Sequence, residues 1–297
     1  MIPTFTVITP SYKTPPAFLA KCIDSVLLQK SKSYRTVHVI IFNGEKPLPD
    51  ISYDLNNHDA YYELIILDCS YVKGVSKARN IGLSYVDSTY YAFLDADDFW
   101  PPLHLEKLHS FYTRYDVDAI STPSRLVYGS CCQSNKTSTP FLCNKQLIFE
   151  ELVFNCIGSP SGFSFKCKTK SFPFFHENLD FYEDYLFYLD LFFSGWSKIY
   201  RVNNSFFYYR IYDGQATNKD NLSRQKFYYL TAQLSQSLLN MGSKYHLNCY
   251  RSFMLRFFVK SRHHLTFNHL SLYSLLTLIY PPYLFSNLAK VFRNYFF

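Results

Sequence analysis

Acidic residues are missing from the last part of the chain: none of the 77 residues after Asp220 (297 − 220 = 77) is Asp or Glu. The same stretch carries nine Lys and Arg residues, so the first 220 residues have a net charge near 7 − 9 = −2. Such an asymmetry indicates an anionic partner for the basic part, either a membrane or a nucleic acid. The sequence contains no recognised nucleic-acid-binding module. We therefore expect the basic part to bind the surface of a membrane and not a nucleic acid. The alternative is a last helix that packs on the core and turns its basic face to solvent.

Paired cysteine motifs are also lacking. The eight cysteines form no C-x-x-C pair and no zinc-type spacing with His, which favours reduced, mostly buried thiols. The N-terminus has no basic leader. The longest uncharged apolar run, 270–285, is broken by Pro281 and falls short of the roughly 20 residues that a membrane-spanning helix needs. We therefore expect a cytoplasmic protein, peripheral to the cytoplasmic face of the inner membrane, with the amphipathic segment 283–297 as its contact.

Short apolar runs alternate with helical patterns in the N-terminal part of the chain. This alternation predicts an α/β fold with a mostly parallel sheet flanked by helices and followed by a helical C-terminal region. We expect a first domain over 1–220 and a basic region over 221–297. The predicted strands are 5–9, 36–42, 63–67 and 90–94, and the predicted helices begin at Pro15-Pro16 and cover 75–85.

The carboxyl ends of parallel strands meet at one edge of a sheet, where ligands bind in open α/β folds. No G-x-G-x-x-G follows the first strand and no P-loop is present, so the motifs argue against a dinucleotide or P-loop site. The segments that should meet at this edge are Pro10-Ser11-Tyr12, Asn43-Gly44, Asp68 and Asp95-Ala96-Asp97-Asp98.

Three carboxylates in four residues follow the buried strand 90–94, at Asp95, Asp97 and Asp98. Clustered like charges repel each other, so the arrangement favours a positive partner such as Mg²⁺ or Mn²⁺ carrying a phosphate group. The alternative is a solvated turn in which Asp97 or Asp98 caps the helix after Pro101.

Two further groups carry chemistry. Arg79 lies near a helix N-terminus, and the helix-interior Gly82 marks a close approach of some neighbour, whereas Lys77 is expected on a solvated face. Glu183 and Asp184 lie among aromatic residues, where desolvation raises a carboxyl pKa and makes a better general base. An N-cap pair is the alternative for these two acids. The turn that includes Gly158 and Ser159 could line a pocket or be a plain connector.

Taken together, these motifs resemble those of family 2 glycosyltransferases. The resemblance rests on the opening segment 5–12, on 19–29, on Ala78-Arg79-Asn80-Ile81-Gly82, on Asp95-Ala96-Asp97-Asp98 and on Glu183-Asp184, and it covers roughly residues 4 to 212. It implies the GT-A fold and inverting transfer of a sugar from a nucleotide-sugar donor, with Mn²⁺ or Mg²⁺, in bacterial surface-glycan biosynthesis.

The resemblance also implies roles for single residues. Asp184 would be the catalytic base and Asp97 the metal ligand. Apart from the resemblance, we expect Gly158, Ser159 and Glu183 on the acceptor side. The nucleotide-sugar would contact Pro10, Ser11, Tyr12, Asn43, Asp68, Arg79, Asp95, Ala96 and Arg210.

One position departs from the family pattern. The family usually ends its second strand with an Asp-rich turn that binds the nucleobase, whereas this chain has Asn43 there.

The acceptor is expected to be a hydroxyl of a glycan or lipid-linked glycan. The alternatives are a polyprenyl phosphate, which needs no general base, and a catalytically silent membrane-bound scaffold with the same fold.

Overall fold

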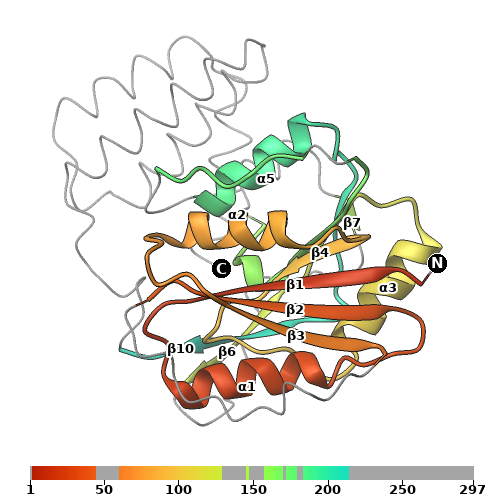
Figure 1. The fold of residues 1–297 in the computed structure, drawn as a ribbon. Helices are drawn as coiled ribbons and strands as arrows, with labels where there is room; N and C mark the ends of the chain where they lie inside the picture. The colour runs from red at the N-terminus through yellow and green to blue at the C-terminus, as the bar shows by residue number, and fades with distance from the viewer. Residues whose placement is uncertain are drawn as a thin grey trace, which may run out of the picture. The chain divides into compact units, whose positions relative to one another are not determined.

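The structure, a computed structural model, describes residues 2–44, 60–128, 145–146, 157–169, 172–178 and 183–213 (Figure 1). The chain divides into two compact units, Met1–Leu222 and Ser223–Phe297, and every described residue belongs to the first. The predicted helical C-terminal region and its segment 283–297 lie outside the described residues, as does the predicted boundary near residue 220.

An eight-stranded sheet forms the centre of this unit, in the order β3-β2-β1-β4-β8-β5-β9-β7. Its first four strands run parallel, while β8 is antiparallel to both β4 and β5. The prediction of a mostly parallel α/β sheet is confirmed. The strands are β1 (Thr4–Ser11), β2 (Arg35–Phe42), β3 (Tyr62–Asp68), β4 (Tyr90–Phe93), β5 (Ala119–Ser121), β7 (Lys145–Gln146), β8 (Phe163–Lys166) and β9 (Ile199–Arg201).

Helices cover both faces of this sheet (Figure 1). The helices are α1 (Pro16–Leu27), α2 (Val75–Tyr85), α3 (His104–Arg114) and α5 (Glu183–Phe193). Alternation along β2 shows how the core divides: Val39 packs in the cluster that includes α2 and α5, whereas Ile40 packs against α1. Within the described residues, no helix combines the length and the apolar character that crossing a bilayer requires.

A second, two-stranded parallel sheet pairs β6 (Ser124–Tyr128) with β10 (Phe207–Ile211). It brings the end of the described chain back beside the first sheet, because Phe99 and Tyr208 form a bridge. This return places Arg210 next to the loop that follows β4.

Gly82 explains how closely α2 packs on the sheet. A Cβ atom at this position would lie 2.5 Å from Cγ2 of Ile8 in β1. The close approach predicted at Gly82 is therefore made by a strand of the core and not by a ligand.

Candidate active site

The ends of the parallel strands are joined by backbone hydrogen bonds. The Asn43 N–H donates to the Ser11 carbonyl at 3.1 Å, and the Leu94 N–H donates to the Ile8 carbonyl at 3.1 Å. The segments predicted at the carboxyl edge therefore lie together, and the loop after β4 lies among them.

Arg79 is a buried cation of the site. Its side chain is only 3% exposed, and it donates to Asp95 Oδ1 at 2.8 Å and to Glu183 Oε1 at 2.9 Å. Burial alone would lower the pKa of its guanidinium, but the charges of Asp95 and Glu183 raise it overall. Arg79 thus ties the loop after β4 to the first turn of α5. The resemblance implied contact with the nucleotide-sugar, whereas in the structure the Arg79 donors bond to the carboxylates of Asp95 and Glu183.

Asp184 follows Glu183 in the first turn of α5 and remains partly exposed. Burial, followed by the charge of the neighbouring Glu183, raises the pKa of Asp184 to about 7, although the Arg79 charge acts in the opposite direction. A carboxyl group with this pKa is half ionised near neutral pH, which suits a general base. Both acids belong to the helix itself, since α5 begins at Glu183.

Asp98 has a structural role that neither sequence interpretation captured. It is 1% exposed, and it accepts from the Ser161 hydroxyl at 2.6 Å and from the Arg210 N–H at 3.0 Å. Burial, followed by the charges of Asp97 and Asp95, raises the pKa of Asp98 well above its usual range. The prediction of a helix cap is wrong for Asp98, because α3 begins at His104 and its N-cap residue, Leu103, has no side-chain cap bond.

The turn at residues 158–162 braces the same loop. Its 3₁₀ segment, η1 (Pro160–Gly162), follows Ser159. The Ser161 hydroxyl accepts from the Asp95 N–H at 3.0 Å, and the Ser159 hydroxyl donates to Asp95 Oδ2 at 3.4 Å. The Gly158 carbonyl accepts from the Tyr188 hydroxyl at 3.3 Å. The structure therefore places Ser159 against Asp95, and sequence reasoning missed the part played by Ser161.

Arg210 and Tyr212 complete the loop from the side of β10. Arg210 Nε donates to the Asp97 carbonyl at 2.9 Å, and its guanidinium lies 4.1 Å from the ring centre of Phe18 in α1. The Tyr212 hydroxyl is hydrogen-bonded to Asp97, and burial and then the Asp97 charge raise the pKa of Tyr212 to about 12. Tyr212 is not among the site residues predicted from the sequence.

The remaining predicted donor-side residues differ in exposure. Tyr12 is 58% exposed, and Asp68 is exposed and accepts from the Ser70 N–H at 3.1 Å. Pro10 is buried in β1 and Ala96 packs in the core against α1. Asn43 is buried, and among the described residues its Oδ1 has no hydrogen-bond partner. A buried acceptor of this kind suits a ligand donor.

A metal site made wholly by the protein is not found: the described residues contain no group of three His, Cys, Asp or Glu side chains arranged for a metal ion. Arg79 engages Asp95, and Asp98 is turned into the core. Asp97 is partly exposed. One carboxylate fits an ion that takes its other ligands from substrate phosphates and water, as Mg²⁺ commonly does.

Comparisons with known proteins agree with this architecture. The model for "Glycosyl transferase family 2" matches residues 6–169. ExoW of Rhizobium meliloti, a succinoglycan biosynthesis protein, is 34% identical over 115 residues, which span 38% of this chain but only 35% of ExoW. WfaP of Escherichia coli, a UDP-Glc:α-D-GlcNAc-diphosphoundecaprenol β-1,3-glucosyltransferase, is 25% identical over 232 residues, covering 73% of this chain and 79% of WfaP.

Solved structures share the fold. The crystal structure of Staphylococcus aureus TarS 1–349 has a TM-score of 0.65 at 17% identity and covers 88% of this chain and 73% of that one. A complex of the same fragment with UDP-GlcNAc has a TM-score of 0.64 at 18% identity, over 88% of this chain and 74% of that one. These likenesses show the GT-A fold.

Proposed function

Because the chain belongs to glycosyl transferase family 2 and is a glycosyltransferase, we propose that it moves a sugar from a uridine-diphosphate donor to a hydroxyl of a glycan or lipid-linked glycan, with inversion, in surface-glycan biosynthesis. The observation that carries this proposal is the link through Arg79 between the loop after β4 and the base candidate on α5. The donor class is supported by WfaP, which is a UDP-Glc-dependent glucosyltransferase, and by TarS, whose structure has been solved with UDP-GlcNAc. The acceptor class is supported by the lipid-linked acceptor, α-D-GlcNAc-diphosphoundecaprenol, in the description of WfaP.

The donor lies, in this proposal, along the carboxyl edge of β1 to β4. The buried Asn43 Oδ1 accepts a hydrogen bond from the nucleobase of the donor. The family usually has an acidic residue at this place. Asp95 is held by both Arg79 and Ser159, so its orientation is fixed before the donor binds. Such preorganisation avoids the cost of ordering the site during the reaction.

Asp184 takes the proton from the acceptor hydroxyl. Its pKa of about 7 allows it to be ionised before attack and still basic enough to accept the proton. Attack on the face of the sugar opposite the diphosphate inverts the configuration. A polyprenyl phosphate acceptor is already an anion and has no proton for Asp184 to remove, so the raised pKa favours a hydroxyl.

The diphosphate is the leaving group, and its charge must be stabilised. Asp97 is the residue that would hold Mn²⁺ or Mg²⁺, which offsets that charge when bound. Arg210 fixes the backbone of the Asp97 loop through the Asp97 carbonyl. Its role here is to position the loop.

The test is release of UDP from a panel of UDP-sugars with Mn²⁺, with Mg²⁺ and with EDTA. We expect release that depends on the metal, and transfer to a saccharide acceptor that falls about 100-fold or more in Asp184→Asn. Full transfer by Asp184→Asn would contradict the role of the base, and the absence of UDP release from every sugar would contradict the proposed donor.

The basic segment 221–297 carries the proposed location at the cytoplasmic face of the inner membrane. Removing residues 283–297 is expected to move the protein from the membrane fraction to the soluble fraction. Unchanged fractionation would contradict the membrane contact.

A further inference from the structure

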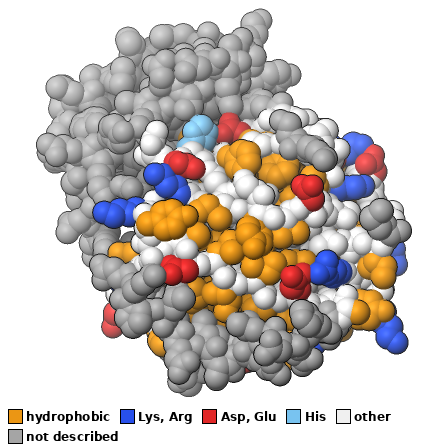
Figure 2. All heavy atoms as spheres, viewed as in Figure 1, with side chains coloured by type: hydrophobic (Ala, Val, Ile, Leu, Met, Phe, Trp, Pro, Cys, Tyr) orange, Lys and Arg blue, Asp and Glu red, His pale blue; other side chains and the backbone are white. Residues whose placement is uncertain are grey.

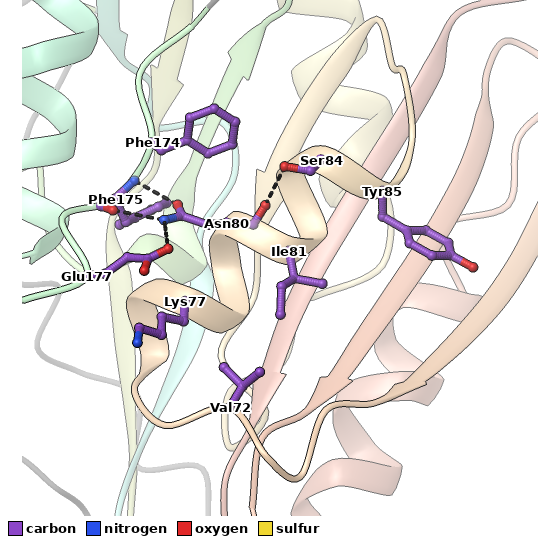
Figure 3. Close-up of a pocket in the computed structure, with 9 residues that line it drawn as sticks. All are labelled: Val72, Lys77, Asn80, Ile81, Ser84, Tyr85, Phe174, Phe175 and Glu177. Carbon is purple, nitrogen blue, oxygen red and sulfur yellow. Dashed lines mark hydrogen bonds between the residues drawn. The ribbon is translucent and has the colours of Figure 1, made fainter.

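An open groove of about 780 Å³ runs along the outer face of α2, opposite the segment 172–178. Figure 3 shows its lining residues, with Asn80 at the centre of the view, Phe174 on the segment above it and Lys77 below. Figure 2, drawn from the same side as Figure 1, shows hydrophobic side chains gathered over this face of the molecule, with charged ones among and around them.

Polar groups follow one face of α2 along the groove. Lys77, Asn80 and Ser84 are three and four residues apart, the spacing that places side chains on the same helical face. Glu177 adds a carboxylate from the opposite wall. Lys77, Ser84 and Glu177 are exposed, so the groove offers an ammonium, a hydroxyl and a carboxylate, which together can donate to and accept from neutral hydroxyl groups.

Two aromatic rings lie exposed in the same lining. Tyr85 is 50% exposed and Phe174 is 47% exposed. A pyranose presents C–H bonds on its faces and hydroxyls at its edges, so it can lie on an aromatic ring while its hydroxyls bond to polar side chains. A lipid chain would place hydrocarbon against the exposed Lys77, Ser84 and Glu177 side chains, and an inorganic anion would lie beside the Glu177 carboxylate.

The wall of the groove is rigid. The Asn80 Nδ2 donates to the Phe175 carbonyl at 2.9 Å and to Glu177 Oε1 at 3.1 Å, and Asn80 Oδ1 accepts from the Phe175 N–H at 2.8 Å. These three bonds, drawn in Figure 3, hold the segment against α2. A groove that is formed before binding loses less entropy when it binds.

The groove also borders the catalytic cluster. The Phe175 ring lies 5.3 Å below the Arg79 guanidinium and stacks on Phe187 of α5 at 4.1 Å. Arg79 in turn bonds Glu183, the neighbour of Asp184. Phe175 and Arg79 therefore connect the groove lining to Glu183, the neighbour of the candidate base.

We propose that this groove binds saccharide units of the acceptor that do not react, with Tyr85 and Phe174 as stacking surfaces and with Lys77, Ser84 and Glu177 as hydrogen-bonding partners. The proposal rests on the proposed function, because it assigns the groove to the acceptor of that reaction. It names a second site on the acceptor and adds no step to the chemistry.

The test uses the full chain and saturation-transfer difference NMR with three tetrasaccharides: chitotetraose, laminaritetraose and maltotetraose. We expect transfer to the ring C–H protons of at least one of them. The variant Tyr85→Ala/Phe174→Ala should weaken its binding about fivefold or more, since two stacked rings at roughly 0.5 kcal/mol or more each contribute about 1 kcal/mol or more together. Phe174→Ala alone should give a smaller loss in the same direction.

Leu28→Ala/Tyr115→Ala is the matched control, because these side chains are 64% and 49% exposed and lie outside the groove lining. It should bind the saccharide as the unchanged chain does, with all melting temperatures alike. No transfer to any tetrasaccharide, or equal binding by Tyr85→Ala/Phe174→Ala, would overturn the proposal. UDP binding is measured in the same samples: if UDP binds and saccharides do not, the groove proposal fails alone, and if UDP does not bind, the proposed function fails.

Discussion

Arg79→Gln is the substitution that most directly tests the site, because it removes one cation from between two carboxylates. Loss of one partner from a buried ion pair costs about 3–5 kcal/mol. Asp95 keeps 27% and Glu183 12% of the side chain exposed, so solvent recovers part of this loss. We expect a loss of about 2–3 kcal/mol in the free energy of unfolding, which corresponds to a melting temperature roughly 5–10 °C lower.

The same substitution changes the pH dependence of sugar transfer. Asp184 must be ionised to accept a proton, so activity in the unchanged chain should rise with pH through a midpoint near its pKa of about 7. The Arg79 charge lowers this pKa, so Arg79→Gln should move the acid limb of kcat upward by roughly 1 pH unit or more. Glu183→Gln removes a charge that raises the same pKa and should move the limb downward.

Arg79→Lys completes the series. It keeps a positive charge but cannot repeat the two-pronged contact of a guanidinium, so it should lose stability while the acid limb stays near its original place. The assay is kcat for transfer between about pH 5 and pH 9, with thermal melting at one fixed pH. If Arg79→Gln and Glu183→Gln shift the limb in the same direction, or leave it in place, the electrostatic reasoning is refuted.

Three further predictions concern stability. Ser161→Ala removes the hydroxyl that donates to the buried Asp98 and should cost about 1–3 kcal/mol by chemical denaturation; an unchanged midpoint would contradict the bracing role of Ser161. Gly82→Ala places a Cβ atom 2.5 Å from Ile8 Cγ2 and should cost about 1–3 kcal/mol, whereas a more stable variant would show that α2 moves away freely. Asp184 has a folded pKa above its unfolded one, so stability falls as pH rises from about 4 to 7. Asp184→Asn should therefore melt a few degrees higher at pH 8 and not at pH 4, and an equal gain at both would contradict the raised pKa.

The sheet was predictable because its strands are marked locally. The run Tyr90 to Leu94 stops at Asp95, and the strand ending at Phe42 stops at Asn43-Gly44. Each boundary is visible within a few residues, and right-handed crossovers then fix which strand ends meet. The predicted parallel edge follows from these two facts.

The different roles of the Asp95, Asp97 and Asp98 carboxylates could not be predicted from local sequence patterns. Asp98 is turned into the core by Ser161, 63 residues away, and by the Arg210 N–H, 112 residues away. No periodicity links positions so far apart. The contacts of Arg79 were missed for the same reason, since Glu183 lies 104 residues further along the chain.

The groove on α2 shows a different limit of prediction from the sequence. Lys77 was correctly predicted to be exposed, but exposure on one helix face does not reveal what faces it. The second wall comes from the segment with Phe174 and Glu177, which has no regular secondary structure. Irregular segments carry little local pattern, so the groove could only be found in the folded chain.

The hydrogen bonds to Asp98 join residues that are far apart in the sequence, and this has a consequence for the order of folding. During synthesis the chain emerges from its N-terminus, so β1 to β4 leave the ribosome well before the residues that hold the loop after β4. Ser161 and then Arg210 must arrive before the buried carboxylate of Asp98 has its partners. Contacts between residues so far apart in the sequence are expected to form late. A nascent chain that ends before residue 210 should therefore contain the strands β1 to β4 without a fully ordered loop after β4. Competence to bind a nucleotide-sugar would then begin only when β10 joins β6.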